Sequence, residues 1–238
     1  MLNLSYDFHL HSCLSPCADD DMTPGNIVGM AAIKKLDVIA LTDHNSCKNC
    51  PPFMKYAEEF GIIGIPGMEL CTAEEVHVIC LFETLEEAMS FDAYVYEKLP
   101  AFQNNPSIFG KQQICNKEDE IISLEPNLLI NATTIPFHQV YDLVTKYHGI
   151  MIPAHIDKTT NSILSNLGFI PGDSKFHCAE ISDLKNLHSL RRNNPYLNTC
   201  NIITNSDAHY LYQINEPDNY IYSESRNSRN ILNALKRG

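Results

Sequence analysis

The chain has 238 residues, 44% of them hydrophobic, and a formal net charge of −12. This length and apolar content allow a sizeable core without disulfides, and one domain is the default expectation. No apolar run approaches the roughly 18 residues that a transmembrane helix requires, and the negative charge, with no Lys/Arg stripe, argues against a long nucleic acid as a partner.

The amino-terminal residues contain neither a basic segment nor an apolar segment of the kind found in secretion signals. Nine cysteines are scattered between positions 13 and 200 without the spacing of a disulfide framework. This distribution is typical of reduced thiols in a reducing compartment. We therefore expect a cytoplasmic protein with no structural disulfides.

Short apolar runs alternate with helix-like stretches in the first part of the chain. This alternation predicts a parallel sheet or barrel, in which functional groups gather where strands end. The predicted elements are a strand at 5–10, a helix at 23–35, a strand at 37–42, a helix at 52–60 and strands at 61–67 and 76–82.

The alternation breaks at residues 83–131, which hold a helix-like stretch, a segment rich in Pro, Asn and Gln, and an acidic patch. We interpret 83–131 as an excursion from a single barrel domain over 1–238 and as a candidate lid, because long loops in compact domains are usually functional or have structure of their own. Afterwards we predict a helix at 136–147 and strands at 149–154, 177–182 and, last, 201–204.

His9 and His11 are separated by one residue at the end of the first predicted strand. On an extended strand, residues two apart point to the same face, so both imidazoles can bind one metal ion. In a chain with ten histidines, a His-x-His pattern on its own is more simply a coincidence.

Other imidazoles and carboxylates follow where further apolar strands end. Hydrogen-bonded core histidines would explain one such placement, whereas four or five at matched positions favour a shared metal centre. The same choice, core histidine or ligand, applies to His77 and His155, which lie beside apolar strands, and we favour ligands. The strand-end residues are Asp43, His44, Glu69, Asp207 and His209. Imidazole with carboxylate suits zinc, manganese or iron, and the sequence does not select among them.

Six motifs in order along the chain resemble the PHP (polymerase and histidinol phosphatase) family. They are His-x-His at 9–11, Thr-Asp-His at 42–44, Gly-x-Glu at 67–69, Glu-x-His at 75–77, Pro-x-His at 153–155 and Ser-Asp-Ala-His at 206–209. The resemblance implies a distorted (β/α)7 TIM-like barrel with a metal site at the C-terminal ends of its strands. It also implies two or three divalent metal ions.

Motif by motif, the resemblance implies three ligand sets. The first ion would bind His9, His11, Glu69 and Asp207, the second Glu69, His77 and His155, and the third His44 and His209. Many family members supply a further His or Asp ligand five or six residues after the second histidine of His-x-His, where this chain has Pro16 and Cys17. Two alternatives remain open: Cys17 or a carboxylate within 19–21 replaces that ligand, or Cys17 is an ordinary small residue.

The resemblance implies a metal-dependent phosphoesterase, and adjacent divalent ions predict that its nucleophile is water. We expect His209 or Asp43 to transfer a proton, with orientation of a ligand as the other role for Asp43, and Lys158 to contact a substrate phosphate. The expected substrate is a small phosphorylated metabolite or nucleotide. The alternatives are a nuclease for short oligonucleotides and a non-catalytic metal-binding regulatory module. The sequence predicts neither the identity of the substrate nor the oligomeric state.

Overall fold

Three parallel strands form the centre of the molecule. The structure, a computed structural model, describes residues 1–237. Strands β1 (Leu2–Leu10), β2 (Val38–Leu41) and β3 (Ile63–Cys71) pair in parallel. All four residues of β2 are buried, in agreement with the apolar run that predicted a strand covered on both faces.

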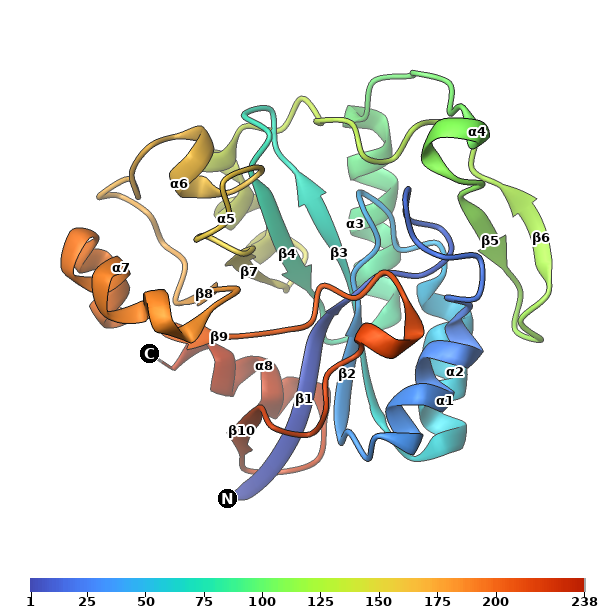
Figure 1. Cartoon of the computed structure of the whole chain (residues 1–238), viewed down its shortest axis with the longest axis horizontal. Coiled ribbons are helices and arrows are strands. Elements are labelled where there is room, and N and C mark those ends of the chain that lie inside the picture. The colour runs from blue at the N-terminus through green and yellow to red at the C-terminus, as the bar shows by residue number, and fades with distance from the viewer. Residues whose placement is uncertain (238) are drawn as a thin grey trace.

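The sheet extends on both sides of these strands and curls (Figure 1). Beyond β3 it continues with β4 (His77–Leu81) and β7 (Ile150–Pro153), and β10 (Tyr220–Ser223) pairs antiparallel with the start of β1. A separate parallel pair consists of β8 (Cys178–Glu180) and β9 (Asn201–Ile203).

The β8–β9 pair lies between β7 and the end of β1. The Ile156 amide donates to the Glu180 carbonyl at 2.9 Å, and Leu10 forms an isolated parallel bridge with Ala208. The strands thus follow one another around the barrel as β1, β2, β3, β4, β7, β8 and β9. This arrangement confirms the predicted distorted (β/α)7 barrel, whose regular strand pairing is interrupted on either side of β8–β9.

The prediction of a uniformly parallel sheet is wrong at β4, which pairs antiparallel with both β3 and β7. Only a tight turn connects β3 to β4, in which the Thr72 amide donates to the Val76 carbonyl at 3.0 Å. A parallel connection needs a crossover of a dozen or more residues. His77, the first residue of β4, consequently lies at the same edge as the carboxyl end of β3.

An irregularity in β1 turns its histidines toward the barrel interior. The register between β1 and β2 shifts between Asp7 and Leu10. As a result, Phe8 packs in the inner apolar cluster whereas Leu10 packs in the outer one, although the two are an even number of residues apart. Bulges of this kind re-aim side chains near functional sites. Beyond the shift, His9 and His11 lie opposite Leu10 and face inward.

Helices cover the outer face of the sheet. The four long ones here are α1 (Pro24–Ile33), α2 (Cys50–Phe60), α3 (Leu85–Lys98) and α5 (Phe137–Lys146), and their apolar residues pack in the outer cluster. Local sequence sets their ends. Thr23 accepts the Asn26 amide at the start of α1, and Gly61, at a φ of 68°, ends α2.

Besides a short 3-10 helix, the structure adds two elements after the strand that the sequence analysis took as the last. They are β10 and α8 (Ser228–Lys236), and Ile231, Leu232 and Leu235 of α8 pack in the inner cluster of the barrel. The other short elements are α4 (Pro106–Phe109), β5 (Gln113–Cys115), β6 (Ile121–Leu124), α6 (Ile163–Asn166), α7 (Leu187–Asn193) and the 3-10 helices η1 (Leu184–Asn186), η2 (Pro195–Thr199) and η3 (Leu211–Gln213).

Within 83–131, helix α3 covers the barrel like its other helices, with the Phe91 ring 5.0 Å from that of Phe82. The remainder, with α4 and the β5–β6 hairpin, lies beside α2 and the loop after β1 (Figure 1). One of its connections to the site runs through Asn45, whose side-chain amide donates to the Leu129 and Asn131 carbonyls. A lid function for this segment stays a prediction.

Candidate metal centre

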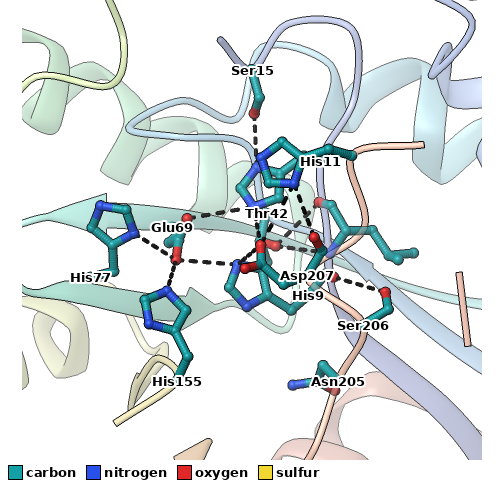
Figure 2. Close-up of polar contacts among 12 residues, drawn as sticks. His9, His11, Ser15, Thr42, Glu69, His77, His155, Asn205, Ser206 and Asp207 are labelled. Atoms are coloured by element: carbon teal, nitrogen blue, oxygen red, sulfur yellow. Dashed lines mark hydrogen bonds and ion pairs between the residues drawn. The ribbon is translucent and has the colours of Figure 1, made fainter. Parts of the chain in front are cut away.

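One carboxylate, that of Glu69 near the end of β3, lies at the centre of the site (Figure 2). It is 1% exposed. Its Oε1 lies 2.9 Å from His77 Nδ1 and 3.2 Å from both His9 Nε2 and His155 Nε2. Its Oε2 lies 2.9 Å from His44 Nδ1 and 3.4 Å from His11 Nε2. Five predicted ligands thus surround a sixth.

A second carboxylate, Asp207, lies on the outer side of the same cluster. Its Oδ1 is 3.4 Å from His9 Nε2, 3.2 Å from His11 Nε2 and 3.8 Å from His209 Nδ1. Its Oδ2 accepts a hydrogen bond from Lys158 Nζ at 2.5 Å. The side chains of Asp207, His209 and Lys158 are 22%, 23% and 41% exposed, so these three form the open rim of an otherwise buried site.

The atoms of this cluster fit bound cations. His9 Nε2, His11 Nε2, His44 Nδ1 and Glu69 Oε2 are buried, and none of them makes a hydrogen bond of acceptable geometry among the described residues, although His44 Nδ1 and Glu69 Oε2 lie only 2.9 Å apart. An unsatisfied buried polar atom costs about 1–3 kcal/mol, so four at one place call for a ligand. Imidazole nitrogen and carboxylate oxygen are the donors that zinc, manganese and iron accept.

Three groups of side chains offer ligand atoms within 4.8 Å of one another: His9 with His11 and Glu69, His44 with Glu69 and His77, and His11 with His44 and His209. They overlap the three ligand sets implied by the family resemblance. The differences are that Asp207 is absent from the first group, that His44 takes the place of His155 in the second, and that His11 appears in the third beside His44 and His209. Asp207 and His155 nevertheless lie 3.2 Å from His11 Nε2 and from Glu69 Oε1, respectively. The assignment of each ligand to one ion stays a prediction.

Cys17 belongs to none of these three groups. Its side chain is exposed, its φ is 68°, and its amide donates to the Phe109 carbonyl at 3.1 Å. The Asp19 amide, in the same loop, donates to the His209 carbonyl at 3.0 Å. The loop therefore reaches the site through its backbone, and of the two alternatives for Cys17 the geometry favours an ordinary residue.

Charge within the site is strongly coupled. Burial alone would raise the pKa of Glu69, but His77, His9 and His44 outweigh it and hold that pKa well below its usual range. Burial would lower the pKa of His9, yet Glu180, Glu69 and Asp207 raise it well above the ordinary value. For His11, burial together with His209 and His44 lowers the pKa well below the ordinary value.

Glu180, at the end of β8, is a site residue that the sequence analysis missed. Both of its carboxylate oxygens lie 3.1 Å from His9 Nδ1, and it accepts the His155 amide at 2.8 Å and Asn205 Nδ2 at 2.7 Å. A carboxylate behind an imidazole fixes its ring and aims the other nitrogen at the metal. Its position as an acidic residue on the strand predicted at 177–182 was the signal that could have found it.

Asp43 lies behind the ligands. It accepts hydrogen bonds from the Ser12 amide at 2.6 Å, Ser12 Oγ at 2.7 Å and Ser15 Oγ at 2.7 Å. Ser15 Oγ in turn lies 2.9 Å from His11 Nδ1 and accepts the His44 amide at 3.1 Å. Burial raises the pKa of Asp43 to about 6. Since Ser15 stands between Asp43 and His11, the geometry favours orientation of ligands over proton transfer.

Comparison with known proteins finds the same family that the motifs indicate. The model of the PHP domain matches residues 7–234. A relative, the uncharacterised protein MJ1587 of Methanocaldococcus jannaschii, is 30% identical over 93 residues, which are 35% of this chain and 54% of that protein.

Solved structures share the fold. Endonuclease Q of Pyrococcus furiosus superposes with a TM-score of 0.72 at 17% identity over 99% of this chain and 56% of its own. A Bifidobacterium adolescentis protein assigned to the metal-dependent phosphoesterases gives a TM-score of 0.61 at 15% identity, over 98% of this chain and 96% of its own. The chain spans about half the length of MJ1587 and of endonuclease Q. The predicted family and fold are confirmed. The predicted enzyme class, a metal-dependent phosphoric ester hydrolase, is consistent with membership of the PHP domain family.

The expectation that long nucleic acid is excluded as a partner was wrong. Endonuclease Q has also been solved with a 27-mer duplex substrate that carries an abasic lesion at the active site, and that structure matches 99% of this chain with a TM-score of 0.69. A net charge of −12 describes the whole surface and says little about one face of it.

None of the helices within residues 1–237 combines the length and the hydropathy needed to cross a membrane. A cytoplasmic location stays a prediction.

Proposed function

Because this chain belongs to the PHP domain family, we propose that it hydrolyses a phosphoric ester with the help of divalent metal ions held around Glu69. The observation that carries the proposal is the set of four buried ligand atoms without hydrogen-bond partners, all of them in this cluster. A family resemblance alone would also fit a regulatory module that had lost its ligands. Here every motif histidine contacts one of the two carboxylates, Glu69 or Asp207.

The proposed ligands are those of the three sets above. The ions are zinc, manganese or iron, two or three in number. Bound divalent ions supply two things here: they make water a nucleophile near neutral pH, and they offset the negative charge of the phosphoryl group. The proposed ligands are His9, His11, His44, Glu69, His77, His155, Asp207 and His209.

The side chains around the ligands hold them in place. Glu180 fixes the ring of His9, and Asp43 acts through Ser15 on His11 and on the backbone of His44. Groups held in advance need not reorganise during the reaction, which is where much of an enzyme's rate gain arises.

The rim residues face the substrate. His209 is the proposed proton donor to the leaving oxygen, because it is partly exposed and lies next to Asp207. Lys158 is the proposed contact of a phosphoryl oxygen. In the structure its ammonium pairs with Asp207, and an incoming phosphate would compete with that carboxylate for it.

The substrate class proposed is a phosphodiester. Endonuclease Q, which shares this fold, has been solved twice, once with a duplex substrate. The open rim suits an ester linkage within a longer molecule, because the ester can reach the ions while its two ends remain outside.

The test is hydrolysis of bis(p-nitrophenyl) phosphate, a generic diester, and of the matching monoester, with manganese, zinc or iron supplied. We expect turnover of the diester. In His9→Ala and in Asp207→Ala we expect turnover to fall further than the about 10–100-fold that follows when a residue supporting a metal ligand is removed. His148→Ala is the matched control, because this exposed histidine pairs with Glu87 outside the site. Full metal loading with no turnover of either ester would favour the regulatory module.

A further inference from the structure

The charge of this acidic protein is unevenly distributed. Residues 184–206 contain Lys185, Arg191 and Arg192 but no Asp or Glu, in a chain with 29 acidic and 17 basic residues. This segment forms η1, α7, η2 and β9. Within residues 1–237, none of the three cations takes part in an ion pair, whereas Lys175 nearby pairs with Asp142. The Arg191 Nε is buried and has no hydrogen-bond partner in the same part of the chain.

These cations border a hollow in the surface. The hollow has a volume of about 540 Å³, and Lys185, Arg191 and Arg192 line it with His188 and Asn198. No carboxylate is among its lining residues. Three like charges around a concave surface repel one another, and an anion bound between them would remove that repulsion. We call the surface formed by Lys185, His188, Arg191, Arg192 and Asn198 the α7 surface.

The α7 surface is fixed to the metal centre by Asp157, two residues after the proposed ligand His155. Asp157 accepts the Ser182 amide at 2.6 Å, the Asp183 amide at 3.0 Å and Asn186 Nδ2 at 2.9 Å. These contacts hold the start of α7 against the loop of His155. In Figure 1, α7 lies on the side of the barrel formed by β8 and β9.

A second hollow, of about 530 Å³, lies between the rim of the site and α7. Lys158 and Thr159 line it from the loop after His155, and Asn186 and Ser189 line it from the helical segment. Asp157 lines it too, and its carboxylate accepts the three hydrogen bonds described above. Hydroxyl, amide and ammonium groups are the side chains that contact phosphate and sugar in nucleic-acid complexes. A line of phosphate-binding groups therefore runs from Lys158, beside Asp207, to Arg191 and Arg192.

We propose that the α7 surface binds the sugar–phosphate backbone of a nucleic acid duplex whose cleaved linkage lies at the metal centre. Successive phosphates along one backbone can contact Lys158, the second hollow and the cations of the α7 surface at the same time. Arginine is suited to this role because its planar group donates two parallel hydrogen bonds to a phosphate. The proposal rests on the proposed function for its substrate class, whereas the binding surface itself is independent of catalysis.

The test is binding of a fluorescein-labelled DNA duplex, measured by anisotropy over a series of salt concentrations. We compare Arg191→Gln/Arg192→Gln with Lys146→Gln/Lys236→Gln, a control that removes two exposed cations from the ends of α5 and α8. In the arginine variant we expect affinity to fall by roughly tenfold or more, and the salt slope to shrink by about one for each phosphate that the protein no longer neutralises. Hydrolysis of the generic diester should be unchanged in both variants.

Equal affinity of the two variants, or equal losses in both, would overturn the proposal. Thermal unfolding of each variant shows whether it folds, and Lys185→Gln, at an exposed position, serves if the double variant does not. Diester hydrolysis without an effect of the arginines on DNA binding would refute the α7 surface alone. Arginine-dependent DNA binding without hydrolysis of any diester would refute the proposed function alone.

Discussion

Glu69 is the residue on which the site depends. A buried carboxylate is stable only when it is paired, and this one lies within 3.4 Å of five imidazole rings. Not all of those rings can be protonated together, because burial and like charges lower the pKa of both His11 and His44. Divalent cations resolve the conflict, since neutral imidazoles and carboxylates can then all act as ligands.

The role of Glu180 can be tested at the level of metal affinity. In Glu180→Gln the side chain no longer carries the charge that orients His9, so we expect metal binding to weaken by about 10–100-fold. The measurement is a competition titration against a chromophoric chelator. Glu86→Gln, at an exposed position of α3, is the control. Unchanged affinity in Glu180→Gln would show that Glu180 does not support a ligand.

The pH dependence of diester hydrolysis in Asp43→Asn distinguishes the two roles considered for Asp43, orientation of ligands and proton transfer. In Asp43→Asn, one of the hydrogen bonds from Ser12 and Ser15 is lost inside the protein, and we expect the free energy of unfolding to fall by about 1–3 kcal/mol. If Asp43 only orients His11 and His44, diester hydrolysis falls while the pH profile keeps its shape. Loss of one limb of that profile would instead identify Asp43 as a group that transfers a proton.

At the scale of elements, the strand-end rule explains why so much of the site was predictable. His44 and Asp207 follow apolar strands and Glu69 lies near the end of one, and the ends of neighbouring parallel strands meet at one edge. The sequence does not show how the strands pair, so the antiparallel β4 and the bulge that turns His9 inward were not foreseen. Glu180 was missed because it ends a strand of only three residues in an otherwise irregular segment.

The carboxyl-terminal elements were missed for a different reason. The helix α8 has its apolar residues at 231, 232 and 235, a helical spacing that marks one buried face. The metal-ligand motifs end at His209, and the sequence analysis found no further ligand motif beyond that residue. Their contribution is to packing, because α8 covers the inner apolar cluster of the barrel.

Gly67 tests the pairing of β3 with β4. A Cβ atom at this position would lie 2.5 Å from the Cys80 carbonyl oxygen and 2.8 Å from Leu81 Cδ2. We therefore expect Gly67→Ala to lower the free energy of unfolding by about 1–3 kcal/mol and to displace Glu69, two residues on. Gly29→Ala is the control, since nothing lies within 4 Å of its Cβ in α1 and alanine favours a helix by roughly 0.5–1 kcal/mol. Denaturant titration measures both, and equal stabilities would contradict the β3–β4 register.

At the scale of the whole molecule, the net charge and the local charge point in opposite directions. The chain is acidic overall, yet the α7 surface gathers three cations and no carboxylate. The sum over all residues therefore misled the prediction about nucleic acid. A partner responds to the potential of the face that it approaches, within about 8–10 Å at physiological salt.

Metal binding should stabilise the whole fold, because the cluster joins β1, β3, β4 and the loops after β2, β7 and β9. With free metal at a thousandfold excess over its dissociation constant, we expect about 4 kcal/mol of added stability. Thermal unfolding before and after chelation, and after metal is restored, measures this. A midpoint that does not respond to chelation would show that metal and fold are not coupled.

The central claim, that the cluster around Glu69 is a metal centre, is tested most directly by elemental analysis of the purified protein beside Glu69→Gln. We predict two or three equivalents of zinc, manganese or iron per chain, and a clear loss of metal in the folded Glu69→Gln variant. A protein that binds no metal under any reconstitution, or binds as much without the Glu69 carboxylate as with it, would contradict the account.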